Sequence, residues 1–223
     1  MEYGEVSEDA RGGLAIPLSC LKPDVACVQE ALSSADRLAE ASGAITWSET
    51  KAGGTGVFVR RGLAAARTRT PTSLLGSYVA AVELSLGSSA LRVFSVHVGP
   101  ESWKNQEAFE PWLVRDVQVG QSLVGGDINT SREYSAKHKA YLNRLIESGV
   151  HDCHWAKQKR EVPSFWGRQS QKPKYQDDHF FASRSLAGAV QDCWVDDNPR
   201  TRILSDHGPV VLDLATEPTD HGW

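Results

Sequence analysis

The sequence predicts a mixed α/β protein of the α+β kind, with two packed sheets flanked by helices. Short apolar or alternating segments typical of strands recur between residues 24 and 214, whereas helical spacing returns in only two longer segments. Several of the strand segments are separated by short polar or glycine-containing stretches, which indicates hairpins. The chain has 223 residues, of which 40% are hydrophobic, and this is enough for one sizeable core. We therefore expect a single domain over residues 1–223, with loose termini at 1–13 and 215–223.

The composition indicates a cytoplasmic protein with reduced cysteines. No apolar run approaches the length of a membrane span, and residues 1–13 are acidic and lack a signal-peptide core. The four cysteines are widely spaced and form no C-x-x-C pair. A net charge of −4 argues against a globally basic surface, although a local basic patch can coexist with it.

The first half of the chain is predicted to be rich in strands. "DVACVQE" follows a Lys-Pro-Asp break and is typical of a strand buried on both faces. Further strands are expected in three segments, of which the last two are joined by a hairpin at "GSSA": "TGVFVRR" (55–61), "SYVAAVELSL" (77–86) and "LRVFSVHV" (91–98).

Helices and strands alternate in the second half. Helical spacing covers 104–119, where Pro111 is expected to mark a break or a first turn. A second helix is expected within 135–150, with Ser135 as its N-cap and Gly149 just past its end. The remaining segments are predicted strands: "QSLVGGD" (121–127), "VPSFWG" (162–167), "DDHFFAS" (177–183), "AVQDCWV" (189–195) and "HGPVVLDL" (207–214).

Polar side chains gather where these strands begin or end. Glu30 closes an apolar strand, where a carboxylate costs desolvation unless it is paired or hydrated. Asp127 and Asn129 in "SLVGGDINTS" lie on the same side of an extended chain, although both residues also form turns by bonding their own backbone. His97 ends another strand, and each of these residues taken singly has an ordinary structural explanation.

Taken together, the ordered set resembles the endonuclease/exonuclease/phosphatase superfamily, which has the fold of pancreatic-type deoxyribonuclease. The resemblance runs from about Leu21 to Leu214 and rests on five features: Q-E at 29–30, H at 97, G-D-x-N within 125–129, D at 178 and S-D-H at 205–207. It implies a four-layer α/β-β/α sandwich of two mainly antiparallel sheets, with the site at the edge where these strand ends meet.

The same resemblance implies a role for each residue. Glu30 and Asp206 would bind Mg²⁺, or alternatively Mn²⁺, since hard cations prefer carboxylate oxygens. Asp127 would orient the attacking water or bind the metal, and Asn129 would donate to the phosphate. A pair of Asp178 and His207 would handle protons or hold the phosphate. His97 would stabilise the phosphate or protonate the leaving group.

Two segments have competing interpretations. "WAKQKREVPSFWGRQSQKPKY" (155–175) mixes cations with rings, which suits nucleic acid and makes Trp166 and Arg168 candidate substrate-binding residues; the alternative is a solvated loop beside a core tryptophan. "HDCHW" (151–155) could suggest zinc, but it lacks four-ligand spacing, and a surface turn after a helix is favoured.

The sequence also departs from the family. Many members have R-I-D-Y where this chain has Gln176–His179, so nuclease specificity cannot be inherited. The family's first strand ends in a metal-binding asparagine, and no such strand is found before Glu30; we expect it to lie upstream of Met1 or to have been dispensed with. The sequence thus predicts an Mg²⁺-dependent phosphodiester hydrolase with nucleic acid as the favoured substrate. A hydrolase of soluble or lipid phosphates, including phosphorylated small molecules, and a non-catalytic binding module are the alternatives.

Overall fold

A six-stranded sheet forms the centre of the fold. The computed structural model describes residues 21–31, 45–50, 53–70, 74, 77–100, 102–166, 174–198 and 205–215. The strand order is β4-β5-β6-β7-β9-β8, and β6 and β7 are the one parallel pair among these neighbours. The six strands are β4 (Ala65–Arg67), β5 (Ser77–Leu86), β6 (Ser89–Val98), β7 (Gln121–Asp127), β8 (His151–Asp152) and β9 (Asp178–Ala182).

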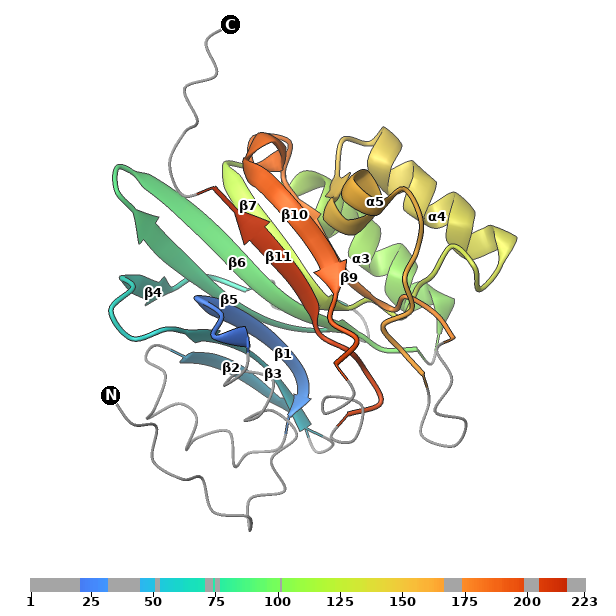
Figure 1. The fold of residues 1–223 in the computed structure, drawn as a ribbon, viewed down its shortest axis with the longest axis horizontal. Coiled ribbons are helices and arrows are strands. Elements are labelled where there is room, and N and C mark those ends of the chain that lie inside the picture. The colour runs from blue at the N-terminus through green and yellow to red at the C-terminus, as the bar shows by residue number, and fades with distance from the viewer. Residues whose placement is uncertain are drawn as a thin grey trace, which may run out of the picture.

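Two smaller antiparallel sheets cover one face of this central sheet (Figure 1). The first has the order β1-β3-β2, and the second pairs β10 with β11. Their bounds are β1 (Val25–Ala31), β2 (Ile45–Thr50), β3 (Gly53–Val59), β10 (Val190–Val195) and β11 (Val210–Leu214). An apolar core that includes Val57, Val93 and Cys193 fills the space between the layers, so side-chain burial holds the sheets together.

Helices α3 (Trp103–Arg115) and α4 (Ala136–Glu147) cover the opposite face of the central sheet. Phe109 and Leu142 of these helices pack with Phe94 of β6 in a second core. A short helix α5 (Cys153–Gln158) packs against β10. The 3₁₀ helix η2 (Ala187–Ala189) directly precedes β10 in the chain.

The predicted arrangement of two packed, mainly antiparallel layers flanked by helices is confirmed. In the described residues, helices α3 and α4 form one outer layer, and the fourth layer of the sandwich stays a prediction. The predicted loose termini lie outside the described residues, apart from Ala215. Cys27, Cys153 and Cys193 are free thiols, as expected. No helix in the described part of the chain is long and apolar enough to cross a membrane.

Several local predictions are confirmed and others are wrong. Ser135 caps α4 by accepting the His138 N–H, and Gly149 follows the helix with φ +93°. Pro111 does not break α3 but lies inside it on the exposed side, where water can reach the carbonyl that loses its N–H partner. Residues 162–166 form no strand, because Phe165 makes only isolated bridges with Tyr175 and His207, and Gly167 lies outside the described residues.

The segment "HDCHW" is not a surface turn. It forms β8 and the start of α5, and Cys153 and His154 are fully buried. Burial lowers the pKa of His154, which therefore stays neutral. No group of three or more histidine, cysteine or acidic side chains that could hold a metal occurs in the described ranges.

Candidate active site

Strand register brings three of the predicted residues side by side. His97 of β6 is paired with Asp127 of the parallel strand β7, and Asp127 is paired with Asp178 of β9. Residues in register on neighbouring strands point to the same face of a sheet, so the three side chains converge at one edge. The predicted cluster of strand-end side chains is thus assembled by three adjacent strands.

Asp127 combines the two interpretations of its sequence motif. Its Oδ1 accepts the backbone N–H of Asn129 at 2.9 Å, which is an Asx turn, and Asn129 has φ +52°. The Asn129 amide donates to the Val98 carbonyl at 2.8 Å, so it ties the turn to the end of β6. Burial and the nearby Asp178 carboxylate raise the pKa of Asp127 well above its usual range.

Asp178 and His207 form the predicted pair. Nδ1 of His207 lies 2.8 Å from Oδ2 of Asp178, and the His207 N–H donates to the Ser205 hydroxyl at 3.0 Å. Burial opposes the charge on His207, but attraction and hydrogen bonding to Asp178 outweigh burial and raise the pKa of His207 to about 10. The same attraction outweighs burial at Asp178 and lowers its pKa. The pair is therefore an imidazolium–carboxylate ion pair at neutral pH.

Ser164 orients this pair and was missed by sequence reasoning. Its hydroxyl donates to Oδ2 of Asp178 at 2.7 Å and accepts the backbone N–H groups of Asp177 and Asp178, each at 3.1 Å. A serine inside an unremarkable apolar segment gives no signal in the sequence, because its partners come from a strand that begins 14 residues later.

A second carboxyl, Asp177, adds negative charge to the cluster. Burial and repulsion from Asp178 raise the pKa of Asp177 to about 6. Its carbonyl accepts the Ile128 N–H at 2.9 Å, which joins the start of β9 to the turn after Asp127. Asp127, Asp177 and Asp178 thus share a partly desolvated region in which a bound cation would be stabilised.

Glu30 reaches the cluster through a distortion of β1. The pairing of β1 with β3 shifts between Val28 and Ala31, and Glu30 has φ +52°. Such a bulge redirects a side chain, and a positive φ at a non-glycine residue is costly. Nε2 of His97 lies 3.9 Å from Oε1 of Glu30 and 3.9 Å from Oδ2 of Asp127, so His97 stands between the two carboxylates.

The residues beside Glu30 fix β1 onto the central sheet. The Gln29 side-chain amide donates to the Ser95 hydroxyl at 2.8 Å. The Ser95 hydroxyl in turn donates to the Val28 carbonyl at 3.2 Å. Gly126 makes this approach possible: a Cβ there would lie 2.0 Å from the Val96 carbonyl oxygen and 2.8 Å from the Gln29 amide nitrogen. The second glycine of "GGD" is therefore required by packing.

The predicted metal ligands, Glu30 and Asp206, are of the chemical type that a hard cation prefers. Glu30 is 67% exposed, so its carboxylate is open to a cation and its waters. Asp206 lies next to His207, and its carbonyl accepts the Trp166 N–H at 3.1 Å. Carboxylates plus waters are a ligand set that Mg²⁺ accepts. The described residues nevertheless contain no ready-made group of three such ligands.

Of the two predicted substrate-binding residues, only Trp166 belongs to the described part of the chain. Trp166 is 3% exposed and packs over Gly208, where a Cβ would lie 2.4 Å from its ring. Its ring is thus part of the interior, which favours the alternative of a core tryptophan over a base-stacking platform. Arg168 lies outside the described residues.

Two of the residues that depart from the R-I-D-Y pattern, Gln176 and His179, have buried side chains. Gln176 is buried, and its Oε1 accepts the Val162 N–H at 3.1 Å. His179 is also buried, with Nε2 lying 2.8 Å from the Thr130 carbonyl oxygen. Both side chains therefore join loops behind the site rather than facing a substrate.

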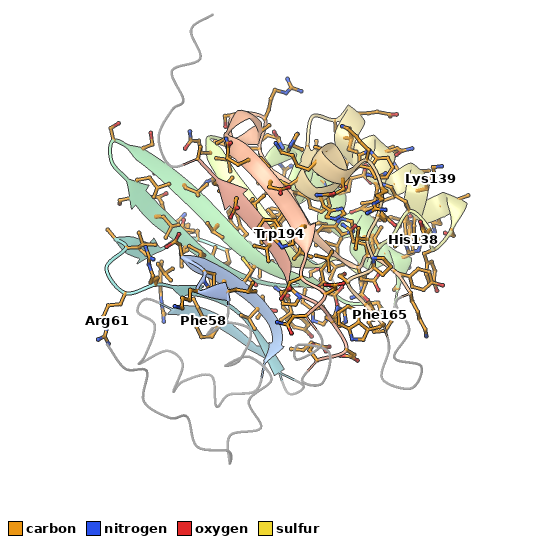
Figure 2. All side chains as sticks on the ribbon, in the orientation of Figure 1. Phe58, Arg61, His138, Lys139, Phe165 and Trp194 are labelled. Atoms are coloured by element: carbon orange, nitrogen blue, oxygen red, sulfur yellow. The ribbon has the colours of Figure 1, made fainter. Side chains whose placement is uncertain are left out.

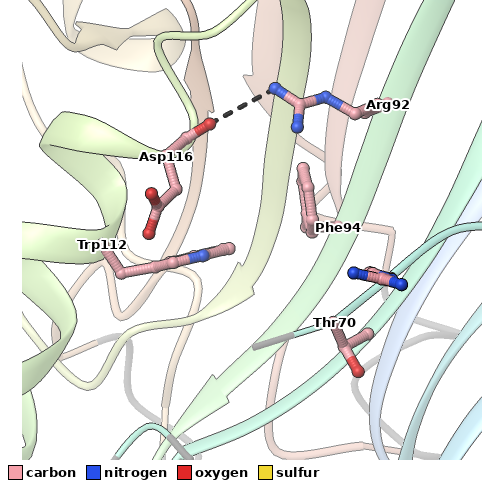
Figure 3. A pocket seen from close by; sticks show the side chains of 6 residues that line it. Thr70, Arg92, Phe94, Trp112 and Asp116 are labelled. Atoms are coloured by element: carbon pink, nitrogen blue, oxygen red, sulfur yellow. Dashed lines mark hydrogen bonds between the residues drawn. The ribbon is translucent and has the colours of Figure 1, made fainter. Parts of the chain in front are cut away.

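A separate groove lies on the other side of the central sheet, near the end of α3 (Figure 3). Arg92 donates to the carbonyls of Asp116 and Val119 and to the Ser122 hydroxyl, so its charge stabilises the end of the helix. The groove is lined by Arg69, Thr70, Arg92, Phe94, Trp112 and Asp116. It contains none of the predicted site residues.

The fold is that of the DNase I-like superfamily of endonucleases, exonucleases and phosphatases. An AP endonuclease (LMAP) from Leishmania major is similar over 93% of this chain and 83% of that chain, with 17% identity and a TM-score of 0.69. An AP endonuclease from Archaeoglobus fulgidus is similar over 90% and 93%, with 16% identity and a TM-score of 0.67. The 3′ phosphatase NExo from Neisseria, bound to a product DNA hairpin, matches over 91% and 95%, with 15% identity and a TM-score of 0.62. No protein-family model and no curated protein matches the sequence.

Proposed function

We propose that the protein is an Mg²⁺-dependent phosphodiester hydrolase with nucleic acid as its favoured substrate. The observation that carries the proposal is the His207–Asp178 ion pair beside the buried carboxyl of Asp127. Fixed cations and dipoles stabilise the charge that develops on a phosphoryl group, and a carboxyl with a raised pKa suits proton exchange near neutral pH.

The charge states suggest distinct roles. Asp178 occupies Nδ1 of His207, which leaves the Nε2–H of the imidazolium to donate to a phosphate oxygen. Asp127 would accept a proton from the attacking water. His97, between Glu30 and Asp127, would donate to the phosphate or to the leaving oxygen.

Glu30 and Asp206 would hold the metal, and in the alternative role Asp127 would be a further oxygen ligand instead of acting on the water. A bound divalent cation would neutralise charge on the phosphate. Mn²⁺ suits the same oxygen ligands, so it is expected to substitute for Mg²⁺.

The choice of nucleic acid is supported by the named neighbours. Two are AP endonucleases, and a third is a 3′ phosphatase bound to a DNA product. Because this third neighbour is named a 3′ phosphatase, phosphomonoesters are also candidate substrates. A non-catalytic binding module of the same fold is the other alternative, and the substrate panel distinguishes it from an enzyme.

A substrate panel tests the proposal. Plasmid DNA, single-stranded DNA, RNA, DNA with an abasic site and phosphomonoesters are incubated with Mg²⁺, Mn²⁺ or a chelator. Metal-dependent cleavage of a nucleic acid is the expected result. Free phosphate from monoesters alone would favour a phosphatase, and binding without any product would favour the non-catalytic module.

Variants connect the activity to the site. Asp127→Ala and His207→Ala are expected to lower turnover by about two orders of magnitude or more, the scale of a lost acid, base or electrostatic group. His151→Ala, which removes a partly buried histidine from the edge strand β8, is the matched control. Full metal-dependent activity in both site variants would refute the assignment.

A further inference from the structure

A row of four rings crosses the surface beside the candidate active site. The ring centroids lie 5.1 Å apart for Tyr175 and Tyr134, 4.6 Å for Tyr134 and His138, and 4.9 Å for His138 and Trp103. Tyr134 is 58% exposed, and the other three rings are partly exposed. We call these four residues the ring row.

The ring row is continuous with the site. Phe165 forms backbone bridges with both Tyr175 and His207, and its ring centroid lies 4.9 Å from that of His207. Phe165 and His138 lie toward the same end of the molecule in Figure 2. A chain bound at His207 could therefore continue directly onto Tyr175 and Tyr134.

The fold holds the middle of the ring row rigidly. Tyr134 ends a turn in which the Glu161 carboxylate accepts the Ser131 hydroxyl at 2.6 Å and the Arg132 N–H at 2.7 Å. Arg132 is itself buried and paired with Asp152 at 3.1 Å. A ring on a fixed turn loses little conformational entropy when a ligand stacks on it.

The far end of the ring row is anchored in the core. Trp103 meets the fully buried Tyr141 edge-on, with ring centroids 5.4 Å apart. Nζ of Lys137 lies 4.1 Å from the centre of the Trp103 ring, a cation–π contact that keeps a positive charge beside the row.

Exposed lysines adjoin two members of the ring row along the chain. Lys137 and Lys139 are exposed on α4, and Lys174 is exposed next to Tyr175. Between residues 132 and 139 the only acidic residue is Glu133. Burial and the nearby Lys137 lower the pKa of His138, so its ring is neutral. Neutral rings flanked by lysines match the bases and the phosphates of a nucleic-acid strand.

We propose that the ring row binds single-stranded nucleic acid, with successive bases stacked on its rings and the lysines facing the backbone. The proposal rests on the proposed function for the direction of the strand, which leads away from His207. It also moves the stacking surface from Trp166, which is buried, to Tyr134, which is exposed. Unpaired bases have free faces for stacking, whereas the bases inside a duplex are already stacked on their neighbours.

Binding in the presence of a chelator tests the ring row independently of catalysis. The affinity of a fluorescent single-stranded oligonucleotide is measured by anisotropy for the unaltered chain, Tyr134→Ala and Tyr134→Phe. The Tyr134→Ala variant loses a base stack, so it is expected to bind about 5- to 150-fold more weakly than the unaltered chain. The Tyr134→Phe variant keeps the ring and is expected to bind about as tightly as the unaltered chain. Ile146→Ala, an exposed truncation elsewhere on α4, is the control and is expected to bind normally.

The outcomes separate this inference from the proposed function. Equal affinities for Tyr134→Ala and Ile146→Ala would overturn it, as would equal losses in the alanine and phenylalanine variants. An equal loss of affinity for a blunt duplex would overturn the single-strand assignment. Failure of the unaltered chain to cleave any substrate with Mg²⁺ would refute the proposed function while leaving this binding measurement valid.

Discussion

At the scale of single residues, neighbouring carboxyls in the site carry opposite pKa shifts. Asp178 contacts the His207 cation and has a lowered pKa, whereas Asp127 and Asp177 have raised ones because burial and mutual repulsion dominate. The sequence identified Asp127, Asp178 and His207 as candidates. It could not assign their protonation, because the distances that decide it arise from strand pairing between Asp127 and Asp178 and from the contact of His207 with Asp178 across two sheets.

Ser164→Ala tests whether this serine positions the ion pair. Removing a hydroxyl that donates to Asp178 leaves that carboxylate free to rotate, so turnover is expected to fall by about tenfold to a hundredfold with little change in KM. Ser164→Thr keeps the hydroxyl and should recover most of the turnover. If the threonine variant is no better than the alanine variant, or if KM alone changes, Ser164 does not act by orienting Asp178.

Asp177→Asn tests the raised pKa through stability. Since the pKa is raised from 3.8 to about 6 on folding, the folded chain binds the proton more tightly than the unfolded chain. Stability should therefore fall as the pH rises from about 4 to about 6, and the asparagine variant should escape that loss. In urea unfolding, the stability of the asparagine variant relative to the unaltered chain is expected to be higher at pH 7 than at pH 4 by about 1–3 kcal/mol. Asp213→Asn, an exposed change on β11, is the control, and a gain independent of pH would contradict the prediction.

At the scale of elements, periodicity predicted strands well and irregular features poorly. The strand over 77–86 agrees with β5 residue for residue, and its apolar run from Val79 to Val82 is buried. The bulge at Glu30 and the helical path through Pro111 could not be predicted, because both depend on neighbouring elements. Strands β2, β4 and β8 were also missed. Strands β4 and β8 have only three and two residues, which carry little pattern, whereas this reason does not apply to the six residues of β2.

Gly126→Ala tests the junction between β1 and the central sheet. The new Cβ would lie 2.0 Å from a backbone oxygen, which no side-chain rotation can relieve, and φ at Gly126 is +148°. The expected cost is about 2–4 kcal/mol of unfolding free energy, measured by chemical denaturation, together with lower activity because Glu30 shifts. Gly188→Ala adds a Cβ where no atom lies within 4 Å and should be nearly neutral. Equal effects of the two substitutions would show that the close approach at Gly126 is unimportant.

At the scale of the whole molecule, the site is assembled from separate sheets. His97, Asp127 and Asp178 belong to the central sheet, whereas Glu30 lies on β1 and His207 just precedes β11. In the described residues the sheets share no backbone ladder, so side-chain packing and side-chain hydrogen bonds, such as that from Gln29 to Ser95, set their distance. The sequence predicted two packed layers because apolar strands need partners. It could not give the strand order, because β9 pairs with β7 on one side and with the edge strand β8 on the other, and both pairings join residues far apart in the sequence.

Hydrogen exchange should reveal this division. Strands β6 and β7 have partners on both sides and are largely buried, whereas β10 and β11 form a two-stranded sheet with partly exposed side chains. Amides of β10 and β11 are therefore expected to exchange faster, by local opening that carries His207 away from Asp178. A ligand that binds only the closed state stabilises it by mass action, so Mg²⁺ with inorganic phosphate should slow exchange in β10 and β11 more than in β6 and β7. Equal protection of all four strands, unchanged by these additions, would instead mean that the layers open as one unit and that the site does not depend on their separate docking.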